Sequence, residues 1–157
     1  MHHQTAIRLA CAAVALGTAL LGSAFAQGQP TKAEQLLKYR KSVYQVIAWN
    51  IGPLSAMAQD KQPFDAAAFA DRAQRVSRLT PMLAESYAPE SRHAKDSKLK
   101  PEMWSNRADF DQKLKDLIDR SATLAKTAEG SDAATSKAAF FDMAKACKAC
   151  HDKYRAD

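Results

Sequence analysis

The sequence has few cysteines, glycines and prolines: its 157 residues include three, five and six of them, respectively. Two of the cysteines lie close together near the C-terminus, so no spare pair remains for a structural disulfide. Stretches of strand length in which apolar and polar residues alternate are missing, and β-branched residues are sparse, which argues against a β-sheet protein. No acid–base pair, Ser/His/Asp set or phosphate-binding loop is evident, and we therefore do not expect an enzyme.

Residues 1–26 have the three parts of a secretory signal peptide: a short, positively charged start, an apolar run from Leu9 to Leu21, and the small-residue cleavage pattern Ala24-Phe25-Ala26. The apolar run is too short to span a bilayer and no stop-transfer pattern follows it, so we expect cleavage and no membrane anchor afterwards. The sequence thus predicts export to the periplasm and one mature domain, residues 27–157.

The net charge of +6 is a moderate excess of basic over acidic residues. The basic residues are spread along every segment and no motif combines them with stacking aromatic residues, so we expect no nucleic-acid partner. A charge of this size favours acidic partners or surfaces through long-range steering.

The segment Cys147-Lys148-Ala149-Cys150-His151 has the Cys-x-x-Cys-His pattern of a c-type haem attachment site. On a helix, the two cysteines and the histidine project from one face, because residues three and four apart are neighbours there. Both thiols can then form thioethers with one porphyrin while the imidazole of His151 binds its iron. The sequence therefore predicts one covalent haem c.

Two other uses of these cysteines were weighed. A structural zinc site needs four ligands, and beyond Cys147, Cys150 and His151 the mature chain offers only His93. A thiol redox pair usually begins the first helix of a βαβ unit and not the last turns of a helical chain. We therefore favour haem.

Apolar residues recur at spacings of three and four in four segments, which predicts an all-α fold. Short connections make neighbouring helices antiparallel, so we expect an up-down-up-down four-helix bundle. In this interpretation Leu36 and Phe141 face inward, with Met82 as a further candidate. Gly52-Pro53 should kink the first helix, and Pro81 should disturb the end of the second.

The first predicted helix spans 31–59, with Thr31 as its N-cap and Glu34 three residues on, and the second spans 66–84 after the cap Asp65. The third spans 101–127 after a long loop at 86–100. The fourth begins at Ser131 or Asp132 and carries the Cys-x-x-Cys-His segment.

Five short segments match the pattern of one family, in that family's order: Tyr39-Arg40-Lys41-Ser42, Gly52-Pro53-Leu54, residues 61–66, Pro101-Glu102-Met103-Trp104-Ser105 and residues 147–155. In these segments, which extend along the whole mature chain, the sequence resembles cytochrome c′. The resemblance implies a soluble, periplasmic haem protein that is usually a homodimer, with contacts expected between the first and second helices of each protomer.

The ligand opposite His151 decides whether the iron has a free position. In relatives of this family with a methionine ligand, the methionine comes from the first helix, four residues after the arginine. Tyr44 stands at the matching position, and a neutral tyrosine is a poor ligand for ferrous iron. We therefore expect a five-coordinate, high-spin iron with Tyr44 in the distal pocket. The alternatives are that Tyr44 only fills the core, or that another methionine makes a low-spin carrier; the candidates are Met57, Met82, Met103 and Met143.

Two arginines are candidate site residues. Arg40 lies one turn before Tyr44 on a mostly apolar face, where a haem propionate is the natural partner for its charge. Arg155 follows His151 by four residues, so on a continuous helix it would lie near the proximal imidazole. The resemblance implies a role for Arg155 in the proximal pocket; the alternative is a frayed charge at the chain end.

The expected function follows from the haem. Such a protein would transfer single electrons to a periplasmic redox partner that the sequence does not identify, and would bind small gases such as NO and CO. Dedicated sequestration of NO is the rival hypothesis within the same fold.

Overall fold

The computed structural model describes residues 29–156, and residues 31–157 form one compact unit. The predicted signal peptide, residues 1–26, lies outside the described residues. In chain order the elements are α2 (Lys32–Ala58), α3 (Ala66–Leu79), η2 (Thr80–Tyr87), η3 (Pro89–His93), α4 (Glu102–Ser105), α5 (Arg107–Ala128) and α6 (Ala133–Tyr154).

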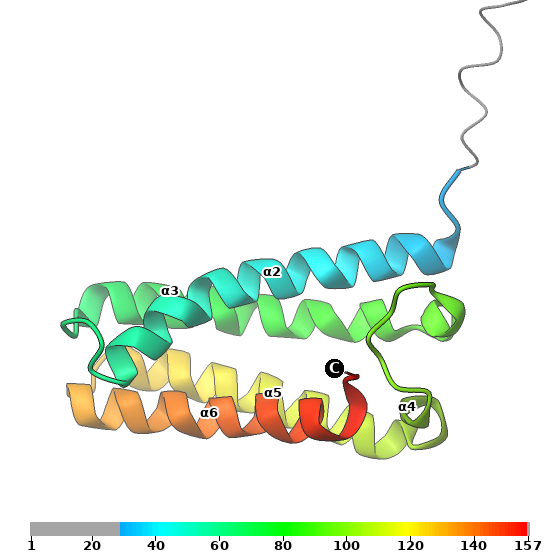
Figure 1. Cartoon of the computed structure of the whole chain (residues 1–157). Coiled ribbons are helices and arrows are strands. Elements are labelled where there is room, and N and C mark those ends of the chain that lie inside the picture. The colour runs from blue at the N-terminus through cyan, green and yellow to red at the C-terminus, as the bar shows by residue number, and fades with distance from the viewer. Residues whose placement is uncertain (1–28, 157) are drawn as a thin grey trace, which may run out of the picture. The chain divides into compact units, whose positions relative to one another are not determined.

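The four long helices α2, α3, α5 and α6 form the predicted antiparallel bundle (Figure 1). α5 packs against α3 and α6, and α2 packs against α3 and α6. The elements of residues 29–156 are all helices, and the β-type pairing in this range is one isolated antiparallel bridge, between Leu99 and Arg155. The all-α expectation is confirmed. No helix in this part of the chain is long and apolar enough to cross a membrane.

Side-chain caps fix where the long helices begin. The Thr31 hydroxyl accepts a hydrogen bond from Glu34 N (3.2 Å), and the Glu34 carboxylate accepts one from Thr31 N (2.7 Å). This reciprocal pair is the capping box expected from the sequence. Asp65 and Asp132 cap α3 and α6 in the simpler way, each accepting a hydrogen bond from a backbone N–H three residues on.

Proline and asparagine account for the differences from the predicted helix bounds. Pro53 lies inside α2 without ending it. Pro81 lies in η2, a 3₁₀ helix that replaces the last turns expected for the second helix. The third predicted helix is divided at Asn106, whose backbone leaves the helical conformation (φ −120°, ψ 40°). Its side-chain amide donates to Glu102 O (2.9 Å), which also accepts from Asn106 N. The loop expected at 86–100 contains the short 3₁₀ helix η3.

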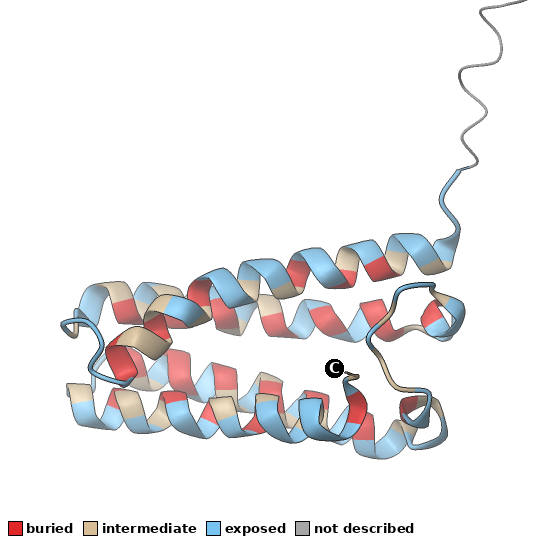
Figure 2. Ribbon diagram, viewed as in Figure 1, coloured by how far each residue is buried: buried red, intermediate tan, exposed pale blue. Residues whose placement is uncertain are grey.

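The buried residues lie on the faces that the helices turn toward one another (Figure 2). Three expectations about these faces were wrong. Leu37, not Leu36, is buried on α2, while Met82 is 39% exposed and Phe141 is 42% exposed. On α6 the inward stripe is continued by Phe140, and its neighbour Phe141 is turned about 100° away along the helix.

Two aromatic clusters lie in this core. Phe69 packs against Phe64 (5.0 Å between ring centroids) and Phe140 (6.5 Å) near the turn between α2 and α3. Phe110 packs edge-on against Tyr87 (4.6 Å) and Tyr154 (5.5 Å) near the end of α6. The first cluster joins the helices α3 and α6, and the second fixes the C-terminal end of α6 against α5 and η2.

We predict that Phe69→Ala destabilises the haem-loaded protein by about 3–5 kcal/mol, because Phe69 is fully buried between two other rings. The matched control is Phe141→Ala, which truncates an exposed ring and should cost less than about 1 kcal/mol. Urea denaturation of both variants measures the difference. Equal losses of unfolding free energy would show that this core assignment is wrong.

Candidate functional site

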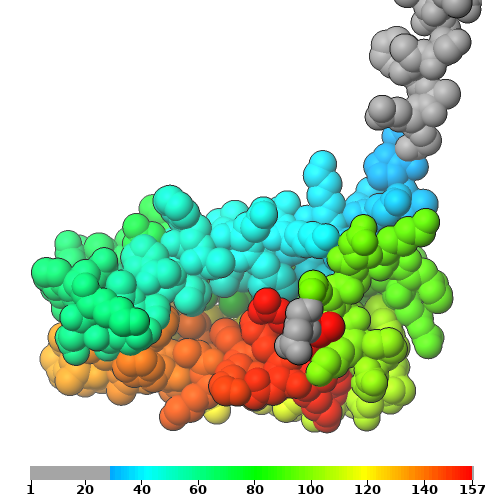
Figure 3. Space-filling view, viewed as in Figure 1, coloured from blue at the N-terminus to red at the C-terminus, as the bar shows by residue number. Residues whose placement is uncertain are grey.

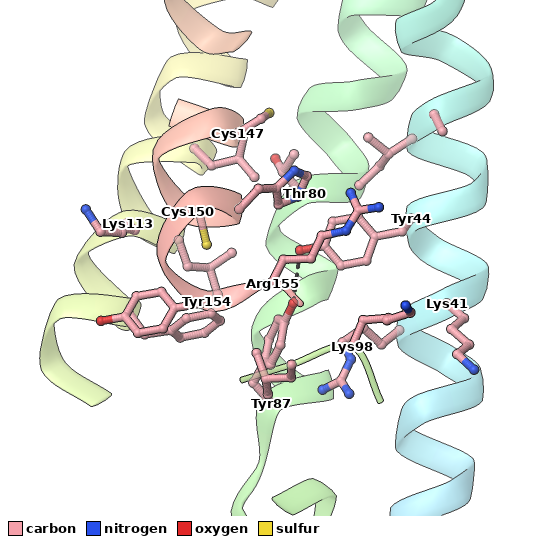
Figure 4. Close-up of a pocket in the computed structure, with 18 of the residues that line it drawn as sticks. Lys41, Tyr44, Thr80, Tyr87, Lys98, Lys113, Cys147, Cys150, Tyr154 and Arg155 are labelled. Carbon is pink, nitrogen blue, oxygen red and sulfur yellow. Dashed lines mark hydrogen bonds between the residues drawn. The ribbon is translucent and has the colours of Figure 1, made fainter. Parts of the chain in front are cut away.

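The last turns of α6 present Cys147, Cys150 and His151 to one cavity of about 570 Å³. The two cysteines are labelled among its lining residues in Figure 4. Its walls come from α2, α3, η2, the segment Ser97–Leu99, α5 and α6. This volume is within the range of about 300–1,000 Å³ typical of small-molecule and cofactor sites. Much of the lining is apolar; its aliphatic residues include Leu37, Ile47, Ile51, Leu114 and Leu117.

The end of α6 is held by a short backbone pairing with the segment before α4. Lys100 N donates to Tyr154 O and Ala156 N donates to Lys98 O, both at 2.8 Å, on either side of the Leu99–Arg155 bridge. The space-filling view shows the C-terminal residues in contact with this segment (Figure 3). The chain end is therefore fixed at the cavity, and the backbone of Arg155 is not frayed.

Tyr154 adds a second anchor to the same turn. Its side chain is 1% exposed, and its hydroxyl donates to a carboxylate oxygen of Asp109 on α5. Lys153 Nζ donates to the same carboxylate oxygen at 3.0 Å. The pKa of Asp109 is lowered below its ordinary value, mainly by the hydrogen bond from Tyr154 and to a smaller extent by the one from Lys153.

Arg155 differs from its predicted position in one respect. Its backbone is extended (φ −105°, ψ 129°), so it follows α6 and does not continue the helical face of His151. Both side chains nevertheless line the cavity and also share a smaller, polar pocket with Lys100 and Asp152. Loss of hydration and the charge of Arg155 lower the pKa of the His151 imidazole, which favours the neutral form that binds metals.

The surroundings of the thiols bear on the two alternative uses of the cysteines. Burial raises the pKa of Cys147 and of Cys150, whereas a reactive redox thiol has a lowered pKa. Among residues 29–156 no group of three or more His, Cys, Asp or Glu side chains could hold a metal ion. His93, the remaining candidate for zinc, is exposed. Neither alternative finds support.

Tyr44 reaches into the cavity from α2, and its hydroxyl lies 3.0 Å from that of Tyr87 (Figure 4). Burial is the main cause that raises the pKa of both tyrosines, so both are neutral phenols at physiological pH. Tyr87 was not predicted as a site residue from the sequence. The available signal was a single aromatic residue at the start of a segment that is otherwise polar.

Arg40 is 5% exposed, and its hydrogen-bond partners among the described residues are neutral. Its guanidinium donates to Ser86 O (3.3 Å) and Ser97 Oγ (3.0 Å) and lies 4.7 Å from the centre of the Tyr87 ring. Burial lowers the pKa of Arg40. No ion pair of Arg40 with a carboxylate is found within the described part of the chain. Because a buried charge without an anionic partner is unfavourable, we expect a bound ligand to supply an anion to Arg40.

Further cations surround the cavity. None of its described lining residues is a carboxylate, whereas five carry a fixed positive charge: Arg40, Lys41, Lys98, Lys113 and Arg155. An apolar interior with basic residues and no acidic ones suits a flat, apolar ligand that carries acid groups. Two thiols and an imidazole in the same cavity complete the set of groups expected for haem c.

The methionines are placed differently from one another. Met57 and Met103 are buried and Met82 is exposed, and none of the three is among the described residues that line the cavity. Met143 does line it, but from α6, one turn before Cys147 and on the same helix as His151.

Comparisons with known proteins agree with this site. The family model described as cytochrome C′ matches residues 35–155. Cytochrome c′ of Rubrivivax gelatinosus is 34% identical over 127 residues, which is 79% of this chain and 96% of that protein. The structure of cytochrome c prime from Shewanella frigidimarina superposes with a TM-score of 0.77 at 36% identity, covering 82% of this chain and all of that one. A nitric oxide complex of a variant of cytochrome c prime from Alcaligenes xylosoxidans has a TM-score of 0.74 at 29% identity, covering 82% of this chain and 100% of that one.

The chain belongs to the cytochrome c′ family, whose members are four-helix-bundle haem proteins. Its cofactor is haem c, as the Cys-x-x-Cys-His segment predicted. The cavity fits this group, because it combines the two thiols, the imidazole and a buried arginine without a carboxylate partner.

We predict that acid destabilises Asp109→Asn less than it destabilises the unaltered protein. The folded-state pKa of Asp109 is lowered from 3.8, so its carboxylate stabilises the fold above that value, and this contribution is lost as the pH falls through the lowered pKa. Urea denaturation at about pH 7 and about pH 3 measures the change. Asp116→Asn, on the same helix, controls for the altered net charge. The same acid sensitivity in all three proteins would contradict the anchoring of α6 through Asp109.

Proposed function

We propose that this protein is a periplasmic cytochrome that holds one high-spin, five-coordinate haem and binds small gases such as NO and CO. The signal peptide, residues 1–26, would direct export and then be cleaved, which leaves the mature domain 27–157. In this proposal Cys147 and Cys150 form the thioethers, and His151 is the axial ligand on the α6 side of the cofactor. The nitric oxide complex of the relative from Alcaligenes xylosoxidans supports the assignment of gas binding.

The main support for an open coordination position is the side chain that faces α6 from α2. In the resemblance to the family, Tyr44 matches the position of the methionine ligand; in the structure it lines the cavity with its hydroxyl bound to Tyr87. A phenol whose pKa is raised by burial stays protonated and is a poor ligand for ferrous iron. Tyr44 would thus shield this side of the haem without binding the metal.

Arg40 and Arg155, which both line the cavity, would have different roles toward the cofactor. The buried guanidinium of Arg40 would bind a propionate, which supplies the anion that its present neutral partners do not. Arg155, which lines the cavity beside His151, would keep the imidazole neutral and stabilise the ferrous over the ferric state through its positive charge.

A haem bound at this place supplies a one-electron redox couple and a site for diatomic ligands. One-electron transfer to a redox partner is therefore part of the proposal, and the basic residues around the cavity would favour an acidic partner. The protein residues hold and shield the cofactor, and we assign no catalytic residue.

The optical spectrum tests this proposal directly. The dithionite-reduced protein should show a five-coordinate, high-spin spectrum that shifts when CO is added. A sharp low-spin spectrum that does not respond to CO would show that a protein side chain occupies the sixth position, and would refute the proposal.

Two substitutions at position 44 extend the test. Tyr44→Met should give a low-spin haem, because the thioether would stand where relatives carry their methionine ligand. Tyr44→Leu, which has no ligand atom, should stay high-spin and bind CO. If Tyr44→Met also stays high-spin, the α2 side chain at this position does not face the iron.

We further propose that the protein is a homodimer that pairs through α2. Val46 and Trp49, three residues apart on this helix, are 49% and 76% exposed. Large apolar side chains at such exposure on one helical face are typical of a contact surface.

Trp49→Glu should weaken this dimer by about 2 kcal/mol or more, or roughly 30-fold in dissociation constant, if Trp49 lies at its centre. Phe141→Glu is the control, because it places the same charge at an exposed aromatic position on α6. Sedimentation velocity over a concentration series measures both constants. A monomeric unaltered protein, or equal effects of the two substitutions, would contradict the α2 interface.

A further inference from the structure

The cavity contains two phenolic hydroxyls that share one hydrogen bond. Tyr44 Oη and Tyr87 Oη are 3.0 Å apart, and either oxygen could be the donor. Each hydroxyl has one hydrogen, and a single bond between them uses one of the two. Within residues 29–156 no further hydrogen bond to either hydroxyl is found, so one phenolic hydrogen in this cavity has no partner.

Either hydroxyl can be the donor of this bond, so an acceptor next to the pair decides its direction. When an acceptor lies beside Tyr44 Oη, both hydrogens are used only if Tyr87 donates to Tyr44 and Tyr44 donates to the acceptor. In that arrangement the outward hydrogen belongs to Tyr44.

Tyr87 is also held more firmly than Tyr44. Its carbonyl oxygen accepts a hydrogen bond from Arg107 (2.7 Å), its ring packs edge-on against Phe110, and the residue is 5% exposed. Tyr44 is only partly buried and reaches across the cavity from α2. The fixed hydroxyl of Tyr87 can thus set the position of the Tyr44 hydroxyl.

We propose that Tyr87 is a positioning residue: by donating to Tyr44 Oη, it turns the Tyr44 hydroxyl hydrogen toward a diatomic ligand on the α2 side of the haem. This inference rests on the proposed open coordination position. Because a hydroxyl that accepts one hydrogen bond becomes a better donor of another, the pair acts together. The pocket therefore favours ligands that accept a hydrogen bond, such as NO, over CO, which accepts one weakly.

The infrared stretching band of bound CO tests the proposal, because a nearby donor hydrogen lowers its frequency. Relative to the unaltered protein, Tyr44→Phe should raise the frequency most, since it removes the hydrogen itself. Tyr87→Phe should raise it less and broaden the band, since the Tyr44 hydroxyl remains but is no longer held. Each substitution keeps the aromatic ring and its packing, so we expect all variants to fold.

Tyr39→Phe is the matched control. Tyr39 lies on the same helix as Tyr44, but its hydroxyl donates to Glu85 and it is not among the described residues that line the cavity. Its removal should leave the CO band unchanged. In NO dissociation measured by stopped flow, Tyr44→Phe should be about fivefold faster than the unaltered protein, the effect of one ordinary hydrogen bond.

The outcomes distinguish the two proposals. If CO binds and the band of Tyr87→Phe matches the unaltered protein in position and width, Tyr87 has no positioning role and this inference is wrong, while the open site stands. If the unaltered protein forms no CO complex, the open coordination position is refuted, and this inference with it.

Discussion

The three groups proposed to hold the cofactor lie within little more than one turn of α6, and the rest of the structure depends on keeping that turn in place. A helix end normally frays, because its last carbonyl groups have no partner within the helix. Here the chain continues into an antiparallel pairing with the segment before α4, and Tyr154 is buried against α5. Both features hold the final turn so that Cys147, Cys150 and His151 face a wall formed by α2.

The charge distribution of the cavity also favours an anionic cofactor. Burying Arg40 among neutral partners is unfavourable unless an anion joins it, because a buried charge loses its hydration. The described lining residues include several cations and no carboxylate, which also favours an anionic ligand. A haem, with its two propionates, supplies this negative charge. Arg40 thereby links two parts of the site, since it also lies over the ring of Tyr87.

Much of the bundle could be predicted from the sequence because local signals agreed with the packing. The capping residues Thr31, Asp65 and Asp132, the helical spacing of apolar residues and the Cys-x-x-Cys-His segment each depend on residues close in the chain. Position 44 was also identified, because the resemblance supplied the register of the first helix. The inward face was predicted less well, since Leu36 and Phe141 each adjoin the residue that is buried.

The features that were missed depend on contacts between distant segments or on the backbone conformation of one residue. Nothing near Leu99 in sequence indicates that it pairs with Arg155, and Tyr87 becomes part of the site only because η2 brings it next to α2. The break at Asn106 is a local departure from the helical conformation that helix propensity alone does not predict. Long-range placement therefore required the structure, while the chemistry of the attachment segment did not.

The intact mass of the exported protein under denaturing conditions tests the central claim most directly. The account predicts the mass of residues 27–157 plus one haem, retained after denaturation because thioethers to Cys147 and Cys150 hold it. A mass equal to that of the polypeptide alone would contradict the account.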